Sequence, residues 1–151
     1  MIIKKETFGA VKGFYKDSTI FENLVLNGVT VEDIYDYLEE SDIYSVYLSN
    51  KFLGFFSVDG SEIHAYILEE ERKNSKNVLL EMMDYSFNTL GLPYIITYVW
   101  SNYDYILRFL KMLGFTHIFT EECVVMSGED CFDLYHLILN KEEYNGKFIQ
   151  K

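Results

Sequence analysis

The chain has 151 residues and a formal net charge of −11, with a pI near 4.6. This length predicts one domain with a substantial core, and the lack of a basic excess excludes broad binding to nucleic-acid phosphates. The chain has no run of about 18 apolar residues, so no membrane span is expected. Residues 1–6 do not begin a secretory signal. The acidic surface would attract a cationic or amine-bearing substrate or partner, or it serves solubility alone.

The first part of the chain predicts short elements. Residues 1–15 alternate weakly and predict one edge strand, and residues 19–26 predict a short helix that ends near Gly28. Thr30 is a good N-cap residue for a helix. The apolar face of that helix is formed by Val31, Ile34, Tyr35 and Leu38.

Three antiparallel strands follow. Residues 44–48 and 52–58 are rich in β-forming residues and are joined by Ser49, Asn50 and Lys51, which predicts a hairpin. Asp59 and Gly60 then predict a tight turn into the next strand.

Residues 62–115 alternate between strand and helix periods. The pattern predicts a strand at 62–68, a charged turn at 69–77, a helix at 78–90, a strand at 94–100 and a helix at 105–113. Gly91 suits a left-handed helix end, and Ser101 with Asp104 predicts a capping box. Two further strands are expected at 117–126 and 132–139, before a polar tail that frays.

The charged turn carries the strongest functional indication. Arg72, Lys73 and Lys76 are three of only 13 basic residues, and they gather where a strand ends and a helix begins. Backbone N–H groups and the positive end of a helix dipole favour anions at such a place. The alternative is a solvated basic turn that Glu69, Glu70 and Glu71 neutralise.

Cysteine and histidine do not predict a metal site. Cys123 and Cys131 are too few for a disulfide framework, and their spacing is unusual for zinc. We expect them to be buried or idle thiols in a reducing cytoplasm. The three histidines, at positions 64, 117 and 136, are scattered along the chain.

The order of elements resembles that of the GNAT superfamily of N-acetyltransferases over about residues 40–140. Its most specific part is the segment from Arg108 to Phe115, which is similar to the family's second-helix signature ending in Lys-x-x-Gly-Phe. Tyr98, Val99 and Trp100 before it, and the Arg-Phe-Leu-Lys form, look closest to small GNAT-like proteins of bacteriophages.

The resemblance implies an α/β (α+β) fold with a mixed, mostly antiparallel twisted sheet of six to seven strands and about four helices. The sheet would split between the strands 62–68 and 94–100, and acetyl-CoA would lie in the split with its pyrophosphate on the charged turn. The family pattern Arg/Gln-x-x-Gly-x-Gly/Ala falls on residues 72–77, where Ser75 and Asn77 replace the small residues. The cofactor-binding residues implied are Ile67, Leu68, Arg72, Lys73, Asn74, Ser75, Lys76, Asn77 and Asn102.

Catalysis by acetyl transfer needs a base for the amine and a group that stabilises the leaving thiolate. In the family a Glu on the strand before the phosphate turn often acts as base, and Glu62 lies near that place. Glu62, His64 and Tyr66 alternate onto one face of their strand, so either Glu62 or His64 could be the base. The family's tyrosine acid is replaced by Leu110, and Tyr103, Tyr105 or Tyr98 would substitute for it; Tyr103 is our first candidate.

Two functions follow. The chain is predicted to be a single-domain, cytoplasmic N-acetyltransferase that uses acetyl-CoA and no metal, acting as a monomer or homodimer on an amine-bearing small molecule or protein. The alternative is a catalytically degenerate binding protein on the same fold, phage-derived, that engages a host or virion protein. The second function is favoured by the replaced glycines and by Leu110.

Overall fold

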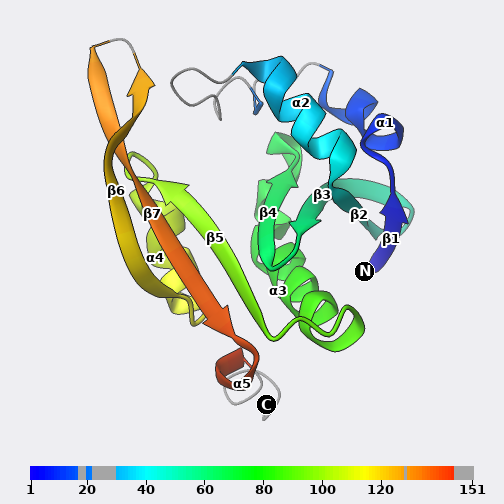
Figure 1. Cartoon of the computed structure of the whole chain (residues 1–151). Coiled ribbons are helices and arrows are strands. Elements are labelled where there is room, and N and C mark those ends of the chain that lie inside the picture. Colours follow the sequence, from blue (N-terminus) through cyan, green and yellow to red (C-terminus); the bar gives the residue numbers. More distant parts are fainter. Residues whose placement is uncertain (17–19, 22–29, 128, 145–151) are drawn as a thin grey trace. The chain divides into compact units, whose positions relative to one another are not determined.

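The computed structural model describes residues 1–16, 20–21, 30–127 and 129–144 (Figure 1). The chain forms two compact units, Met1–Leu90 and Gly91–Lys151, and each is described by itself. The helix predicted at 19–26 falls outside the described residues except for Ile20 and Phe21, which lie in a turn.

Among its described residues, the first unit contains four strands in the order β1-β2-β3-β4, and each neighbouring pair is antiparallel. The strands are β1 (Ile2–Glu6), β2 (Asp42–Leu48), β3 (Lys51–Asp59) and β4 (Glu62–Ile67). Its helical segments are α1 (Phe8–Val11), α2 (Val31–Glu40) and α3 (Ser75–Asp84), the 3₁₀ turns η1 (Lys12–Tyr15) and η3 (Glu69–Asn74), and the π-helical segment η4 (Tyr85–Thr89). The edge strand, the α2 helix and the three-strand meander were all predicted, and they are confirmed.

Local sequence explains the boundaries of these elements. The Thr30 hydroxyl accepts from the Asp33 N–H and the Asp33 carboxylate accepts from the Thr30 N–H, so a full capping box starts α2. Ser49 and Asn50 both have positive φ, as a tight two-residue hairpin between β2 and β3 requires. Gly54 brings β3 and β4 close, because a Cβ there would lie 2.6 Å from the Tyr66 carbonyl oxygen.

The sheet of the first unit carries aromatic side chains on both faces. Phe55 packs with Phe8 of α1 and is stacked on Tyr66 of β4. Phe56, the next residue, points to the opposite face, where it meets Tyr44 and Tyr85. The helices α1 and α2 therefore cover one face through the Phe55 cluster, while η4, which continues α3, covers the other.

The charged segment after β4 differs from the predicted turn. Residues 69–74 form the 3₁₀ turn η3, which runs directly into α3 at Ser75, three residues earlier than expected. Glu69, Glu70 and Glu71 occupy its first turn, where acidic side chains complement the helix dipole. The expectation of a charged turn at 69–77 and a helix from residue 78 was therefore wrong in its bounds, because residues 69–74 form a 3₁₀ turn and the α-helix begins at Ser75.

The second unit contains three strands in the order β5-β7-β6, all antiparallel. They are β5 (Tyr94–Trp100), β6 (Thr116–Ser127) and β7 (Asp130–Asn140), with α4 (Asp104–Met112) after β5 and α5 (Lys141–Tyr144) after β7. Gly91 has φ of +71°, as predicted for a helix end. Two expectations were wrong: the tail does not begin to fray at residue 140, because Tyr144 is buried, and Ser101 does not cap α4.

The expectation that the two cysteines are free thiols was also wrong. Cys123 and Cys131 form a disulfide across the β6–β7 hairpin, with Cα atoms 5.0 Å apart. The ladder shifts register between Glu121 and Val125, so the residues of β6 between them form a bulge. This bulge was not readable from the sequence, and Cys123 lies within it while Cys131 pairs with Met126 in the ladder.

The fold class is the predicted one, a mixed α/β fold with seven mostly antiparallel strands and, among the described residues, five α-helices. The last strand of the first unit is β4 and the first strand of the second is β5. None of the helices in the described part of the chain is long and apolar enough to cross a membrane.

Candidate active site

Glu62 and His64 lie side by side on β4. His64 Nε2 is 3.2 Å from Glu62 Oε2, so the two side chains share one face of the strand, as their alternation predicted. The His64 side chain is 12% exposed and that of Glu62 is 38% exposed.

Tyr37 of α2 completes the group. Its hydroxyl donates to Glu62 Oε2 over 3.1 Å, the same oxygen that faces His64. Burial, followed by the negative charge of Glu62, raises the pKa of Tyr37 above its ordinary value, so the phenol stays a neutral donor. Sequence reasoning missed Tyr37, because it lies beside the apolar face of α2 and only the fold brings it to β4.

Glu62 and His64 have different neighbours in this group. Glu62 Oε2 faces both the Tyr37 hydroxyl and His64 Nε2, an arrangement that suits a carboxylate that orients an imidazole. His64 Nε2 lies near Glu62 Oε2 at 3.2 Å but does not form a hydrogen bond with it.

The segment after β4 is held by a residue outside it. Glu71 is 1% exposed, and its carboxylate forms an ion pair with Lys51 of β3 and accepts from the Asn74 amide over 2.9 Å. The bond from Lys51 lowers the pKa of Glu71 below its ordinary value, against the effect of burial. Lys51 was predicted only as a hairpin residue, and nothing local in the sequence connects it to Glu71.

The three predicted cations are arranged around the start of α3. Arg72 and Lys73 lie in η3 and Lys76 in the first turn of α3, and all three are exposed. Among the residues that the structure describes, no carboxylate lies within ion-pair distance of any of them. Neutralisation by direct ion pairs with Glu69, Glu70 and Glu71 is therefore not observed there.

The other residues predicted to bind the cofactor in this segment differ in burial and in hydrogen bonding. Asn74 precedes α3 but its side chain makes no capping bond, and its amide nitrogen donates to Glu71 Oε2. The Ser75 N–H is bonded to the Arg72 carbonyl, and Asn77 is exposed. Leu68 is buried, with its N–H bonded to Leu53 and its carbonyl to Glu71, and Ile67 is paired with Gly54.

The predicted site residues of the second unit are grouped near the start of α4. Asn102 is exposed in the turn after β5, and Tyr103 is the half-buried residue just before α4. The Tyr103 ring packs near Trp100 and Tyr105. Leu110, which stands where the family has tyrosine, is buried.

A cavity of about 420 Å³ lies in the first unit beside α1 and α2. The described residues that line it are Gly9, Lys12, Gly13, Tyr15, Lys16, Phe21 and Tyr35. None of the predicted site residues is among them, and the two lysines make it a poor fit for a cationic amine. Elsewhere in the described chain, no three His, Cys, Asp or Glu side chains are grouped so that they could hold a metal ion.

The sequence matches no protein-family model and no curated protein. Solved structures resemble it in fold: the spermidine N-acetyltransferase of Vibrio cholerae, in complex with CoA and spermine, matches with a TM-score of 0.75 and 12% identity, over 95% of this chain and 96% of that chain. The ribosomal-protein-alanine N-acetyltransferase of Brucella melitensis matches with a TM-score of 0.69 and 15% identity, over 93% and 99%.

An N-acetyltransferase of Staphylococcus aureus Mu50 also matches, with a TM-score of 0.67 and 17% identity, over 92% of this chain and 96% of that one. The chain thus has the fold of N-acetyltransferases, as the resemblance to the GNAT superfamily implied. The resemblance to bacteriophage proteins has no support among these structures.

Proposed function

We propose that this protein is an N-acetyltransferase, which moves the acetyl group of acetyl-CoA to a primary amine. The observation that carries the proposal is the group of three cations, Arg72, Lys73 and Lys76, which follow β4 directly and have no ion-pair partner among the described residues. The fold shared with solved N-acetyltransferases supports it.

The residues present fit the pyrophosphate of acetyl-CoA. Three exposed positive charges complement its negative phosphates, and the start of a helix adds its dipole and its amide groups. Ser75 and Asn77 are small enough for a close approach and can donate hydrogen bonds themselves. Acetyl-CoA would supply the activated acyl group, and Asn102 of the second unit is proposed as a further contact.

His64 is proposed as the general base. It would accept the proton of the acceptor amine at Nδ1, and Glu62 would stabilise the resulting imidazolium through Nε2. Tyr37 would hold the Glu62 carboxylate in place. Tyr103 stays our candidate for protonating the leaving thiolate, since Leu110 cannot do so.

The acceptor is proposed to be a cationic amine, either a small molecule or an amine on a protein. The net charge of −11 favours the approach of a cation. The Vibrio cholerae enzyme with the same fold was solved with spermine, a polyamine. We treat the two units as one domain, because the solved structures match nearly the whole chain.

A cytoplasmic location and a homodimer or monomer remain parts of the proposal. Disulfides are more usual in oxidising compartments, so the Cys123–Cys131 bond makes the location worth measuring directly.

Calorimetric titration with acetyl-CoA tests the proposal. We expect micromolar binding by the wild-type chain, lost in Arg72→Glu/Lys76→Glu. The matched control Lys4→Glu/Lys5→Glu changes the net charge equally on the exposed strand β1 and should bind normally.

Absence of binding at millimolar acetyl-CoA would overturn the proposal. It would favour the alternative, a binding protein that has kept the fold and lost the cofactor site. The replaced glycine positions, Ser75 and Asn77, and the buried Leu110 are the features that favour this alternative.

A further inference from the structure

The β6–β7 hairpin contains a bulge that the disulfide closes. Glu121 pairs with Leu134 and Val125 with Phe132, so the three residues between Glu121 and Val125 stand opposite Asp133 alone. Cys123 is the middle residue of this bulge, and its φ of +53° is in the left-handed region that non-glycine residues rarely adopt. Its side chain is bonded to Cys131 of β7.

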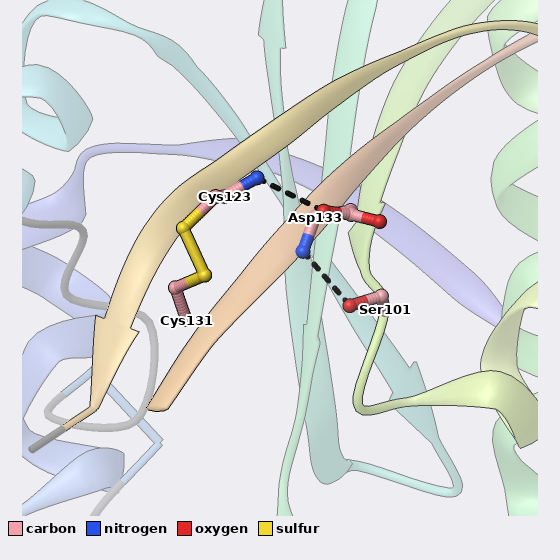
Figure 2. The surroundings of a disulfide bond; sticks show 4 residues. All are labelled: Ser101, Cys123, Cys131 and Asp133. Carbon is pink, nitrogen blue, oxygen red and sulfur yellow. Dashed lines mark hydrogen bonds between the residues drawn. A yellow bond between two sulfur atoms is a disulfide. The ribbon is translucent and has the colours of Figure 1, made fainter. Parts of the chain in front are cut away.

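Asp133 connects this bulge to the end of β5. Its carboxylate oxygen Oδ1 accepts from the Cys123 N–H over 2.9 Å. Its own N–H donates to the Ser101 hydroxyl over 2.8 Å, and its carbonyl accepts from the Ser101 N–H over 2.8 Å. Figure 2 shows Asp133 between the disulfide on one side and Ser101 on the other.

Ser101 begins the short segment that leads into α4. Asn102 and Tyr103 follow it, and the Tyr103 N–H is bonded to the Trp100 carbonyl. Asn102 is the proposed cofactor contact of the second unit, and Tyr103 is its first candidate for the acid. The disulfide and the candidate site are therefore joined by one residue, Asp133.

We propose that the Cys123–Cys131 pair is a reversible redox site that controls the conformation of residues 101–103. That this segment belongs to an active site rests on the proposed function; the coupling itself does not. Both cysteines are exposed, so a dithiol reductant can reach the bond.

Reduction follows ordinary thiol–disulfide exchange. A thiolate of the dithiol attacks one protein sulfur, the protein S–S bond breaks, and a mixed disulfide forms with release of the other cysteine as thiolate. The second thiol of the reductant then displaces the first cysteine and closes the reductant's own disulfide. Two electrons pass to the protein, and both cysteines end as thiols after taking up two protons.

The reduced bulge has less to hold it in place. Without the covalent bond, Cys123 can leave its left-handed conformation, and its N–H can part from Asp133 Oδ1. The Asp133 side chain then loses its bond from the Cys123 N–H. The backbone of the same residue, Asp133, is bonded to Ser101. Reduction should therefore loosen residues 101–103 as well as the bulge.

Amide hydrogen exchange measured by NMR, on the oxidised chain and on the chain reduced with dithiothreitol, tests this coupling. We expect exchange at Cys123 and Ser101 to accelerate on reduction by about tenfold or more, with little change at the centre of β5. Acceleration confined to the bulge would overturn the proposal, because the disulfide would then be a local clamp. Failure of the two thiols to re-form the disulfide when the reductant is replaced by an oxidised dithiol would also overturn it, because the site would then not be reversible.

Two variants isolate the connection. Asp133→Ala removes the acceptor of the Cys123 N–H, so the redox dependence at Ser101 should disappear, whereas Asp133→Asn keeps an oxygen acceptor and should retain it. Cys123→Ser/Cys131→Ser should show the reduced pattern without reductant. If that variant does not fold, the wild-type comparison still decides.

Acetyl-CoA titration of both redox states separates this proposal from the proposed function. Equal binding in both states, with coupled exchange at Ser101, would leave the redox site intact but remove its influence on the cofactor. Failure of binding in both states would count against the acetyltransferase function alone, because the exchange measurement needs no cofactor.

Discussion

The buried carboxylate of Glu71 forms an ion pair with Lys51, the first residue of β3, and this pair fixes the segment between β4 and α3. The Glu71 carboxylate is therefore ion-paired with Lys51 and not with the cations that follow it in the chain. Arg72, Lys73 and Lys76 are exposed, and the proposed function assigns them to the pyrophosphate of acetyl-CoA.

Replacing Lys51 should destabilise the protein. Lys51→Met removes the cation that pairs with the buried Glu71 carboxylate and leaves it the Asn74 amide as a donor, and an unpaired buried charge is costly. We expect a lower urea midpoint for this variant. Lys5→Met is the control, since it removes the exposed Lys5–Asp42 pair at 3.7 Å and should change stability by less than about 0.5 kcal/mol. Equal midpoints for the two variants would mean that the buried pair contributes no more than a surface pair.

The same pair predicts acid sensitivity. The pKa of Glu71 is lower in the folded protein than its ordinary value, so the unfolded chain takes up this proton first as the pH falls. Its contribution to stability is present above about pH 4.3, the ordinary glutamate value, and is lost as the pH falls through the folded pKa. Urea midpoints measured from pH 6 to pH 3 should decline less in Glu71→Gln than in the wild type.

The buried Tyr15 predicts a loss of stability at alkaline pH. Its hydroxyl donates to the buried carbonyl of Tyr66, and burial raises its pKa above the ordinary value of about 10. Above pH 10 the unfolded chain loses this proton more readily than the folded one, so stability should fall as the pH rises further. Tyr15→Phe should weaken this alkaline dependence. At pH 7 it should cost about 1–2 kcal/mol, because the Tyr66 carbonyl loses its side-chain donor. If the stability of the variant falls above pH 10 as much as that of the wild type, other groups cause the fall.

Gly54 should not tolerate a side chain. A Cβ at this position would lie 2.6 Å from the Tyr66 carbonyl oxygen and 2.8 Å from the Ile67 Cα, both backbone atoms that cannot rotate away. Gly54→Ala should therefore destabilise the protein by about 2–3 kcal/mol. Gly13→Ala is the matched control, because a Cβ there meets nothing within 4 Å. Thermal unfolding of both variants measures the difference, and similar melting temperatures would contradict the close approach of β3 and β4.

Tyr37, Glu62 and His64 should have separable roles if the proposed function is right. Replacing the base, as in His64→Ala, should lower turnover by about 10²-fold or more. Tyr37→Phe leaves the base in place and removes only the donor to Glu62, so kcat should fall less while KM is unchanged. Tyr94→Phe, an exposed tyrosine of β5, is the control. Full activity of His64→Ala would remove His64 as the base and leave Glu62 as the remaining candidate.

Sequence reasoning found most of the fold, because the elements have strong local signals. Thr30 caps α2 with its own side chain, and Ser49 and Asn50 make the tight hairpin between β2 and β3. The face shared by Glu62 and His64 follows from strand alternation alone. Where the local reading was wrong, as with Ser101, the hydroxyl had a distant alternative partner in Asp133.

What the sequence alone determined about this protein is therefore most of its local structure, the position of its basic residues along the chain and, through the resemblance to a known superfamily, its fold class. The tertiary structure alone decided three further relationships: Tyr37 with Glu62, Lys51 with Glu71, and Cys123 with Cys131. Caps, turns and alternation depend on residues a few positions apart, so a sequence displays them. Contacts between distant residues depend on register, and a bulge or a strand pairing sets that register only when the chain has folded.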